Sequence, residues 1–334
     1  MTSWARPIET GWVLADPHHG PRALPAARSA LDRLLAKAYR PVRDVVVAYE
    51  VDGRDGTARG VLCLIDPTAV DSHVWHSEEV YPRIVAERAA ALLGLGRATS
   101  AALLVPVAEG EALTAAVGES VGSREPQVRT TDAGGRTHRL WLLEDHADLL
   151  TAVQRRQLLV ADGNHRVAAA TSADLPLLAL VTAGPDLRIG AIHRALTGTG
   201  LRVAELAAAW RRAGLTVREQ ADPSPPAEPG TVTVPGGLVV DLPASGEPLP
   251  RIDHGLVERV LIAGALGIDP EGPHVRAMPE GRVPGPDVDA LLQLAPVPFA
   301  DVLAMHEQGR RMPRKSTYFT PKPAAGLLIA DLPA

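Results

Sequence analysis

Short apolar runs alternate with polar breaks along this chain, and their spacing predicts both strands and helices. Apolar runs bounded by turn residues predict strands at 44–51, 60–65, 101–107, 127–131, 138–143, 158–162, 177–182, 232–234, 238–242 and 325–329. Helical spacing predicts helices at 83–94, 145–156, 202–212, 255–263, 287–294 and 299–308, the last closed by Gly309. The proline-rich stretch 221–230 is expected to form a loop. Because strands and helices do not alternate regularly, the pattern indicates an α+β (mixed α/β) fold.

The run 158–170 is the most informative segment of the chain. Its apolar stretch breaks at Asp162-Gly163 and continues as an alanine-rich run, which predicts a strand, a tight turn and a helix start. Free N–H groups at such a start can bind an anion, and His165 and Arg166 add side-chain donors. Asp162, at the strand end, could orient a cation or a substrate hydroxyl. The alternative interpretation is an ordinary corner with solvated polar residues.

Length and composition limit the function classes. The 334 residues can form two domains or one large one, and the net charge of -5 does not favour a nucleic-acid partner. The single cysteine, Cys63, excludes an internal disulfide framework and a multi-cysteine zinc site. The N-terminus lacks the apolar stretch of a signal peptide, and no apolar run is long enough to span a bilayer. We therefore expect a cytoplasmic protein without a membrane partner and leave its oligomeric state open.

A second candidate site is the segment 310–322, which carries five cations and three Ser or Thr hydroxyls. Only three of the 34 basic residues are lysines, and two of them, Lys315 and Lys322, lie here. The segment differs from a Walker loop, because Arg314 replaces the second glycine and a helix precedes it. Its apolar residues indicate a packed segment that suits an anionic ligand.

Four motifs, taken in order, resemble those of the free serine kinase family (domain-of-unknown-function family 1015) of the ParB/sulfiredoxin superfamily. The matching segments are Gly-x-x-His-x-Leu-Trp at 135–141, Ala-Asp-Gly-x-His-Arg at 161–166, Ile192-His193-Arg194, and Met-Pro-x-Lys-Ser-Thr-Tyr-Phe-x-Pro-Lys at 312–322. The resemblance runs from about residue 40 to the C-terminus. It implies a ParB/sulfiredoxin-like nucleotide-binding core at 41–184, an N-terminal extension at 1–40, and an α/β region at 185–334 whose final segment returns to the active site.

The resemblance also implies a reaction, in which ATP or ADP donates a phosphoryl group to free L-serine or a related hydroxy amino acid with Mg²⁺. The family's catalytic glutamate precedes a proline and an acidic-Arg pair, a spacing that Glu78 matches here, with Glu79 as competitor. Both glutamates are expected to open a helix. Ser77 and Val80 depart from the family's His-Glu-x-Thr pattern.

The implied roles fall into four groups. Catalytic residues are Glu78, as the base, with Asp162 and His165. Nucleotide phosphates are assigned to Gly163, Asn164, His165, Arg166, Lys315, Ser316 and Thr317. Substrate binding is assigned to His193, Arg194 and Glu79, and Mg²⁺ to Asp162.

Several of these residues have an alternative interpretation. His193-Arg194 could be a surface pair after a strand, and His73 and His76 are expected to be structural rather than zinc ligands. A sulfiredoxin-like reductase is excluded, because Asn164 stands where its cysteine is needed. A ParB-like DNA clamp is disfavoured by the acidic balance. A nucleotide-binding regulator that has lost catalysis stays open.

Overall fold

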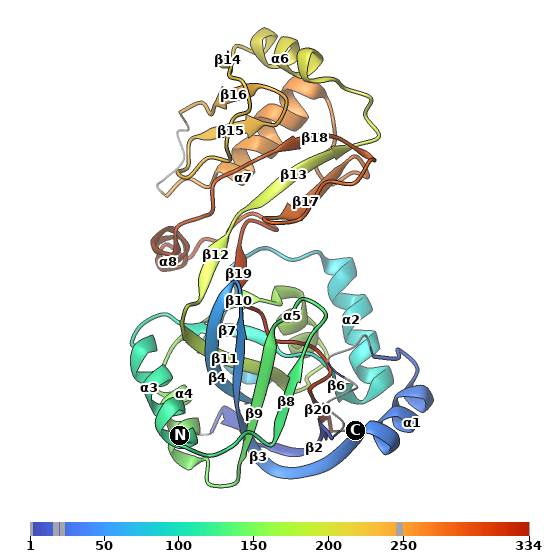
Figure 1. Cartoon of the computed structure of the whole chain (residues 1–334), viewed down its shortest axis with the longest axis vertical. Helices are drawn as coiled ribbons and strands as arrows, with labels where there is room; N and C mark the ends of the chain where they lie inside the picture. The colour runs from blue at the N-terminus through green and yellow to red at the C-terminus, as the bar shows by residue number, and fades with distance from the viewer. Residues whose placement is uncertain (1–2, 16–19, 21–23, 245–249, 334) are drawn as a thin grey trace. The chain divides into compact units, whose positions relative to one another are not determined.

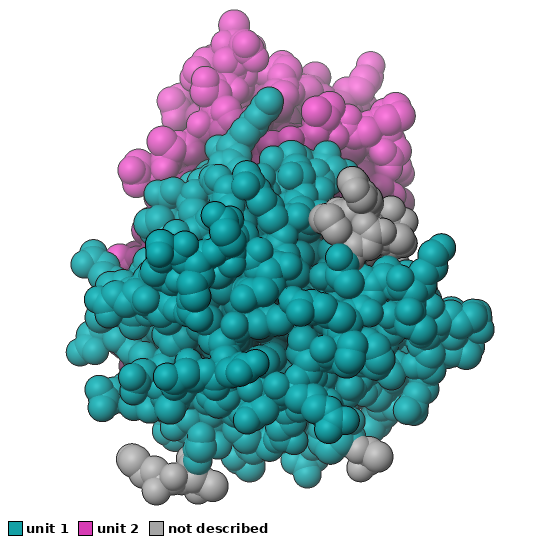
Figure 2. All heavy atoms as spheres, turned by 60° about the horizontal axis from the view of Figure 1, so that its bottom comes forward, with its two compact units in different colours: residues 1–188, 319–334 teal, residues 189–318 magenta. Residues whose placement is uncertain are grey.

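The computed structural model describes residues 3–15, 20, 24–244 and 250–333, and it combines helices with several sheets. This mixture confirms the α+β class expected from the sequence. The chain forms two compact units, one of residues 1–188 and 319–334 and the other of residues 189–318 (Figure 2). Among the described residues, no helix is both long and apolar enough to cross a membrane.

The first unit is built on one 12-stranded sheet (Figure 1). Its main path runs β5 (Val74–Trp75), β10 (Leu158–Asp162), β7 (Ala102–Pro106), β11 (Leu177–Pro185), β4 (Gly56–Ile65), β3 (Tyr39–Gly53), β2 (Ile8–Leu14), β20 (Leu328–Asp331) and β6 (Arg97–Ala98). Off this path, β1 (Ala5–Arg6) pairs with β4, and β8 (Val128–Thr131) and β9 (Thr137–Leu143) extend from β3. The described helices are α1 (Arg28–Ala38), α2 (Pro82–Leu95), α3 (Gly110–Val121), α4 (Ala147–Gln154) and α5 (Asn164–Ser172), with a 3-10 turn at Pro67–Ala69.

The main core of this unit lies between the sheet and helices α3, α4 and α5. Alternate residues of β4, including Val61 and Cys63, point into it, as the period of a strand requires. Burial raises the pKa of the Cys63 thiol to about 12, so this side chain stays protonated and packs as a small apolar group. A second, smaller core forms where α1 packs on Ile329 of β20.

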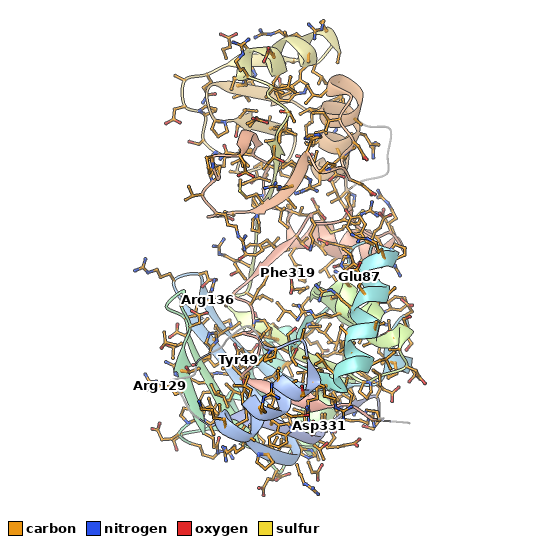
Figure 3. All side chains as sticks on the ribbon, turned by 90° about the vertical axis from the view of Figure 1, so that its right-hand side faces the viewer. Tyr49, Glu87, Arg129, Arg136, Phe319 and Asp331 are labelled. Carbon is orange, nitrogen blue, oxygen red and sulfur yellow. The ribbon has the colours of Figure 1, made fainter. Side chains whose placement is uncertain are left out.

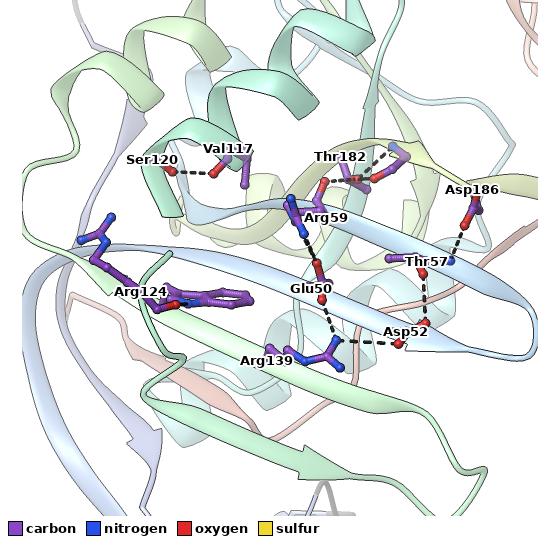
Figure 4. Close-up of polar contacts among 12 residues, drawn as sticks. Glu50, Asp52, Thr57, Arg59, Val117, Ser120, Arg124, Arg139, Thr182 and Asp186 are labelled. Carbon is purple, nitrogen blue, oxygen red and sulfur yellow. Dashed lines mark hydrogen bonds and ion pairs between the residues drawn. The ribbon is translucent and has the colours of Figure 1, made fainter. Parts of the chain in front are cut away.

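A buried carboxylate fixes the register of three neighbouring strands. Glu50 of β3 is 7% exposed and accepts from Arg59 Nε of β4 at 2.8 Å and from Arg139 Nη1 of β9 at 2.6 Å (Figure 4). Two guanidinium groups on one carboxylate compensate for its removal from water. A one-residue slip of either strand would turn one arginine to the other face of the sheet.

Sequence and structure agree on most of this unit. The β3–β4 hairpin, the strand that ends at Asp162 and the helix that follows it are confirmed. The final strand is shifted, since β20 covers Leu328–Asp331 rather than 325–329. Within residues 1–40, β2 pairs with both β3 and β20 in the large sheet. The expected division into an N-terminal extension, a core at 41–184 and a region at 185–334 stays a prediction.

The second unit has two small antiparallel sheets. One has the order β17 (Val275–Pro279), β13 (Ile192–Thr197), β18 (Val288–Leu292), and the other β14 (Val217–Glu219), β16 (Leu238–Asp241), β15 (Thr231–Val234). The helices are α6 (Val203–Arg212), α7 (Asp253–Leu256) with its π-helical continuation Val257–Gly264, and α8 (Phe299–Glu307). The buried Trp210 lies in the core of this unit, and its indole donates to Leu261 O at 3.1 Å. The unit boundaries fall within β12 (Arg188–Gly190) and β19 (Tyr318–Thr320).

One predicted helix in this unit is wrong. Residues 287–294 contain β18, which pairs with β13 in antiparallel register. Ala290, Leu291 and Leu292 are all buried, so the second half of the strand is covered on both faces and shows no alternation. A short apolar run of this kind has no period that separates a strand from a helix. The helix at 299–308 is confirmed as α8, and Gly309 follows it with a φ of 66°.

Candidate active site

The predicted strand–turn–helix corner at Asp162–Arg166 is present in the structure. Strand β10 ends at Asp162, Gly163 has a φ of 101°, and α5 begins at Asn164. A Cβ at Gly163 would lie 2.7 Å from Arg166 Nε, so both the backbone angle and the space require glycine here. The first N–H groups of a helix have no intrahelical acceptor, and they make this corner suitable for an anion.

Asn164 connects this corner to the loop that carries Glu78. Its Oδ1 accepts from the Ser77 N–H at 3.2 Å and the Glu78 N–H at 3.5 Å, and it lies 3.1 Å from His76 Nδ1. Its Nδ2 donates to Ser77 Oγ at 3.2 Å, which in turn donates to Val160 O at 2.6 Å. The Asn164 side chain is 7% exposed, so it holds the loop from inside the protein. Through Asn164, the backbone of Glu78 and the ring of His76 both contact the corner.

Glu78 and Glu79 do not begin a helix, although the sequence predicted that they would. Helix α2 begins at Pro82, and both glutamates lie in the loop before it. A proline in the first turn sets the helix start, because its missing N–H needs no partner there. Glu78 is 9% exposed, whereas Glu79 is exposed, so the two neighbouring carboxylates have different surroundings.

His165 holds the same loop nearer to α2. Its Nε2 accepts from the Tyr81 N–H at 2.9 Å, and its ring stacks on the Tyr81 ring with centroids 5.8 Å apart. The accepting Nε2 leaves Nδ1 as the position of the proton in the neutral ring. The first two side chains of α5 therefore both hold the loop between β5 and α2.

Asp162 is paired with two cations. Its Oδ2 accepts from Arg166 Nη2 at 2.5 Å, and its Oδ1 accepts from Lys322 Nζ at 2.6 Å. Arg166 Nη1 also donates to Ser100 Oγ at 3.0 Å and to the Ala101 carbonyl. Lys322 thereby joins the corner from 160 residues along the chain.

The two cations bear on the expected Mg²⁺ site. A divalent ion on Asp162 would compete with Arg166 or Lys322 for the same oxygens. Within the described part of the chain, no group of three His, Cys, Asp or Glu side chains is arranged to hold a metal. A single carboxylate still suits Mg²⁺ that is bound mainly through substrate phosphates. A Mg²⁺ role for Asp162 therefore stays a prediction.

A cavity of about 140 Å³ lies beside Arg166 in the first unit. Its walls are mostly apolar side chains of α2, α5 and β11, and its polar groups include Arg88, Ser100 and Arg166. Burial lowers the pKa of Arg166, Asp162 opposes that shift, and the charge of Arg88 adds to it. Two repelling guanidinium groups at one cavity favour an anion between them.

In the second unit, His193 and Arg194 are buried within β13, so the alternative of a surface pair is wrong. His193 Nδ1 accepts from the Leu294 N–H at 3.2 Å. Arg194 pairs with Glu258 at 2.7 Å and donates to the carbonyls of Arg314 at 3.2 Å and Lys315 at 3.1 Å. Arg194 therefore holds the backbone at Arg314 and Lys315, within the segment 310–322 that carries five cations.

The other predicted phosphate ligands follow in this segment. Lys315 is exposed and has a φ of 54°, while Ser316 and Thr317 are buried. Ser316 Oγ donates to Pro313 O at 2.7 Å, which closes a turn just before it. The nucleotide and substrate roles of these residues stay predictions.

Sequence reasoning missed two features of the corner. The connecting role of Asn164 depends on contacts 86 to 88 residues away along the chain, for which no local pattern exists. The pairing of Lys322 with Asp162 was missed as well. The scarcity of lysine was a usable signal, because it singled out Lys322 in an arginine-rich chain.

Comparison with known proteins gives similar structures of low identity. A conserved hypothetical protein from Pyrococcus furiosus is 12% identical, with a TM-score of 0.45, over 79% of this chain and 93% of that one. A mutant free serine kinase in complex with AMP is 12% identical, with a TM-score of 0.45, over 80% and 92%. SbnI from Staphylococcus aureus, truncated at its C-terminus, is 13% identical, with a TM-score of 0.44, over 78% and 82%.

No curated protein matches the chain. A family model does, over residues 16–235, and its description is a protein of unknown function, DUF1015. This match covers more than half of the chain and includes both Glu78 and the corner at Asp162–Arg166. The chain therefore belongs to the DUF1015 family.

Proposed function

We propose that this protein is a small-molecule kinase that transfers a phosphoryl group from ATP or ADP to the hydroxyl of free L-serine or a related hydroxy amino acid. The observation that carries the proposal is the hydrogen-bonded connection between the Glu78 loop and the helix start at Asn164. It supports the proposal because it joins the loop of the buried Glu78 to a helix start that can bind an anion, and the reaction needs both a base and a phosphate site. The sequence resemblance to the free serine kinase family supplies the substrate class.

In the proposed reaction, Glu78 accepts the proton of the acceptor hydroxyl. The hydroxyl oxygen forms a bond to the terminal phosphorus, and the bond from that phosphorus to its bridging oxygen breaks, which releases ADP from ATP or AMP from ADP. The N–H groups at the start of α5 and Arg166 bind the phosphate oxygens. Mg²⁺, when bound with the phosphates, supplies positive charge against the developing charge of the transferred group.

Two further parts of the nucleotide site are assigned by their chemistry. The cavity beside Arg166 takes the nucleoside, since its apolar walls suit a planar base and its guanidinium groups suit the attached phosphates. Lys322, which is hydrogen-bonded to Asp162, adds a positive charge to the nucleotide site. Lys315, Ser316 and Thr317 are assigned to the phosphates or the substrate carboxylate, and His193, Arg194 and Glu79 to substrate binding.

Incubation with labelled ATP or ADP and a panel of L-serine, L-homoserine and L-threonine tests the proposal. We expect a phosphorylated amino acid with at least one donor and acceptor pair. Nucleotide binding without transfer to any acceptor would contradict catalysis. That result would favour the alternative of a regulator, which the departures from the family pattern at Ser77, Val80 and Val167 suggest.

A further inference from the structure

His138 belongs to a motif that the proposed reaction does not use, and it lies in a buried chain of polar groups in the first unit. Its Nδ1 is 2.8 Å from Tyr49 Oη, and its Nε2 is 3.2 Å from Asp132 Oδ2. Tyr49 is 1% exposed and His138 is 0% exposed (Figure 3 labels Tyr49). The Tyr49 hydroxyl also accepts from the Ala324 N–H at 3.1 Å.

The groups at the two ends of this hydrogen-bonded series, Asp132 and the Ala324 N–H, determine the direction of each hydrogen bond in it. Burial alone would raise the pKa of Asp132, but N–H groups and His138 hold it below the ordinary value, so Asp132 is an ionised acceptor. Burial lowers the pKa of His138, so its ring is neutral and carries its proton on Nε2, toward Asp132. Nδ1 then accepts from the Tyr49 hydroxyl, which leaves the Tyr49 oxygen to accept from the Ala324 N–H. Each donor has one acceptor in this arrangement.

The hydrogen-bonded series ends at Ala324, which is two residues from Lys322 in the sequence. We define the C-terminal segment as residues 320–326, which begin at the last residue of β19, lead toward β20 and carry both Lys322 and Ala324. Thr320 Oγ1 donates to Asp55 at 2.5 Å, and Asp55 also pairs with Arg136 at 2.8 Å. Side chains of β3, β9 and the adjoining hairpin loops therefore hold this segment on both sides of Lys322.

We propose that Tyr49 and His138 are positioning residues that hold the C-terminal segment so that Lys322 remains on Asp162. The proposal rests on the proposed function in one respect, because the Asp162 corner is the assigned nucleotide site. Lys322 must reach Asp162 from an irregular segment, and the Ala324 N–H, two residues away, is a fixed point for it. Tyr49 and His138 touch no reacting atom in this account, so they act through Lys322.

The three lysines of the chain allow a direct measurement of Lys322. Its amine is partly exposed and hydrogen-bonded to Asp162, whereas Lys37 is exposed on α1 and serves as an internal reference. Limited acetylation of the full chain, read by mass spectrometry, gives the ratio of Lys322 to Lys37 labelling. We expect Tyr49→Phe to raise this ratio about fivefold, the equivalent of one net hydrogen bond. A ratio equal to that of the wild type would overturn the proposal.

Two further variants separate positioning from simple loss of stability. Asp132→Asn keeps the oxygen acceptor but presents an amide to His138 Nε2, which forces the ring proton to Nδ1 and leaves the Tyr49 hydroxyl proton without an acceptor. It alters a half-buried turn rather than the core, and we expect it to raise the ratio as Tyr49→Phe does. Tyr39→Phe is the matched control, because it removes a hydroxyl that donates at 2.6 Å to Gly326 O, farther from Lys322. An equal rise in Tyr39→Phe would overturn the proposal.

Calorimetric titration with ADP distinguishes this proposal from the proposed function. We expect Tyr49→Phe to weaken ADP binding about fivefold in the wild-type background and to have no further effect in Lys322→Ala. Additive losses in the two variants would contradict action through Lys322. If no variant and not even the wild type binds ADP, the proposed function fails, and the labelling ratio alone still decides whether Tyr49 positions Lys322.

Discussion

Replacing Asn164 with alanine removes the connection between the helix start and the Glu78 loop, and its cost follows from the contacts. The side chain makes contacts of 3.1 Å to His76 Nδ1, 3.2 Å to the Ser77 N–H and 3.2 Å to Ser77 Oγ, and a longer one of 3.5 Å to the Glu78 N–H. At about 1 kcal/mol for each net bond, with the longest discounted, Asn164→Ala should lower the free energy of unfolding by about 2–3 kcal/mol. For a unit of this size the melting temperature should fall by about 4–12 °C.

Thermal unfolding followed by circular dichroism measures this loss, and Thr171→Ala provides the control. Thr171 is an exposed residue on the same helix, so its variant should stay within about 0.5 kcal/mol of the wild type. Because Asn164 fixes the loop of Glu78, we also expect turnover to fall about 10²-fold in Asn164→Ala. Equal melting temperatures for the two variants would refute the reasoning, since Asn164 would then carry no net stabilisation.

Three other predictions address separate parts of the chain. Arg166→Ala should weaken ADP binding about tenfold or more in calorimetry, because a charged phosphate donor is lost, and unchanged affinity would count against the nucleotide site. Arg194→Ala should lower the free energy of unfolding by about 2–4 kcal/mol in thermal melts, because two carbonyls and the partly exposed Glu258 lose their partner, and a wild-type melt would contradict this. Burial, with the charge of Arg194, lowers the pKa of His254 from 6.5 to about 3, so its stabilising contribution is complete above pH 6.5 and is lost as the pH falls toward 3. Between pH 3 and 6.5, the free energy of unfolding of His254→Gln, measured by urea titration, should change with pH less steeply than that of the wild type, by about 1.4 kcal/mol per pH unit. Equal slopes in the two proteins would refute this prediction.

Local patterns predicted the parts of the fold that depend on neighbouring residues. The corner at Gly163 was predictable because a strand, a glycine turn and a helix follow one another within 15 residues, Leu158–Ser172. Strand β18 was not, because its apolar end, Ala290, Leu291 and Leu292, is buried on both faces and has no alternation. Strand β2 was missed as well, although it pairs on both sides within the large sheet.

The same division applies to the site. Glu78 was chosen as the candidate base through the family resemblance, by its spacing to Pro82 and Arg88, and this role stays a prediction. Asn164 is hydrogen-bonded to the Glu78 loop, and Arg166 is hydrogen-bonded to Asp162 and the Ala101 carbonyl. These bonds depend on how distant segments of the chain pack. A motif therefore identified which residues meet at the corner, but it could not show which of their atoms already have partners.

The proposed mechanism depends on Glu78 as the base of a phosphoryl transfer at this corner. The rate of transfer from labelled ATP or ADP to free L-serine should be compared for the wild type, Glu78→Gln and Glu79→Gln. We expect Glu78→Gln to lose about 10²–10⁴-fold in turnover while it still binds nucleotide, because a general base contributes about that much. Glu79→Gln, whose side chain is exposed, should stay near the wild-type rate. Full activity in Glu78→Gln, or loss confined to Glu79→Gln, would contradict the account.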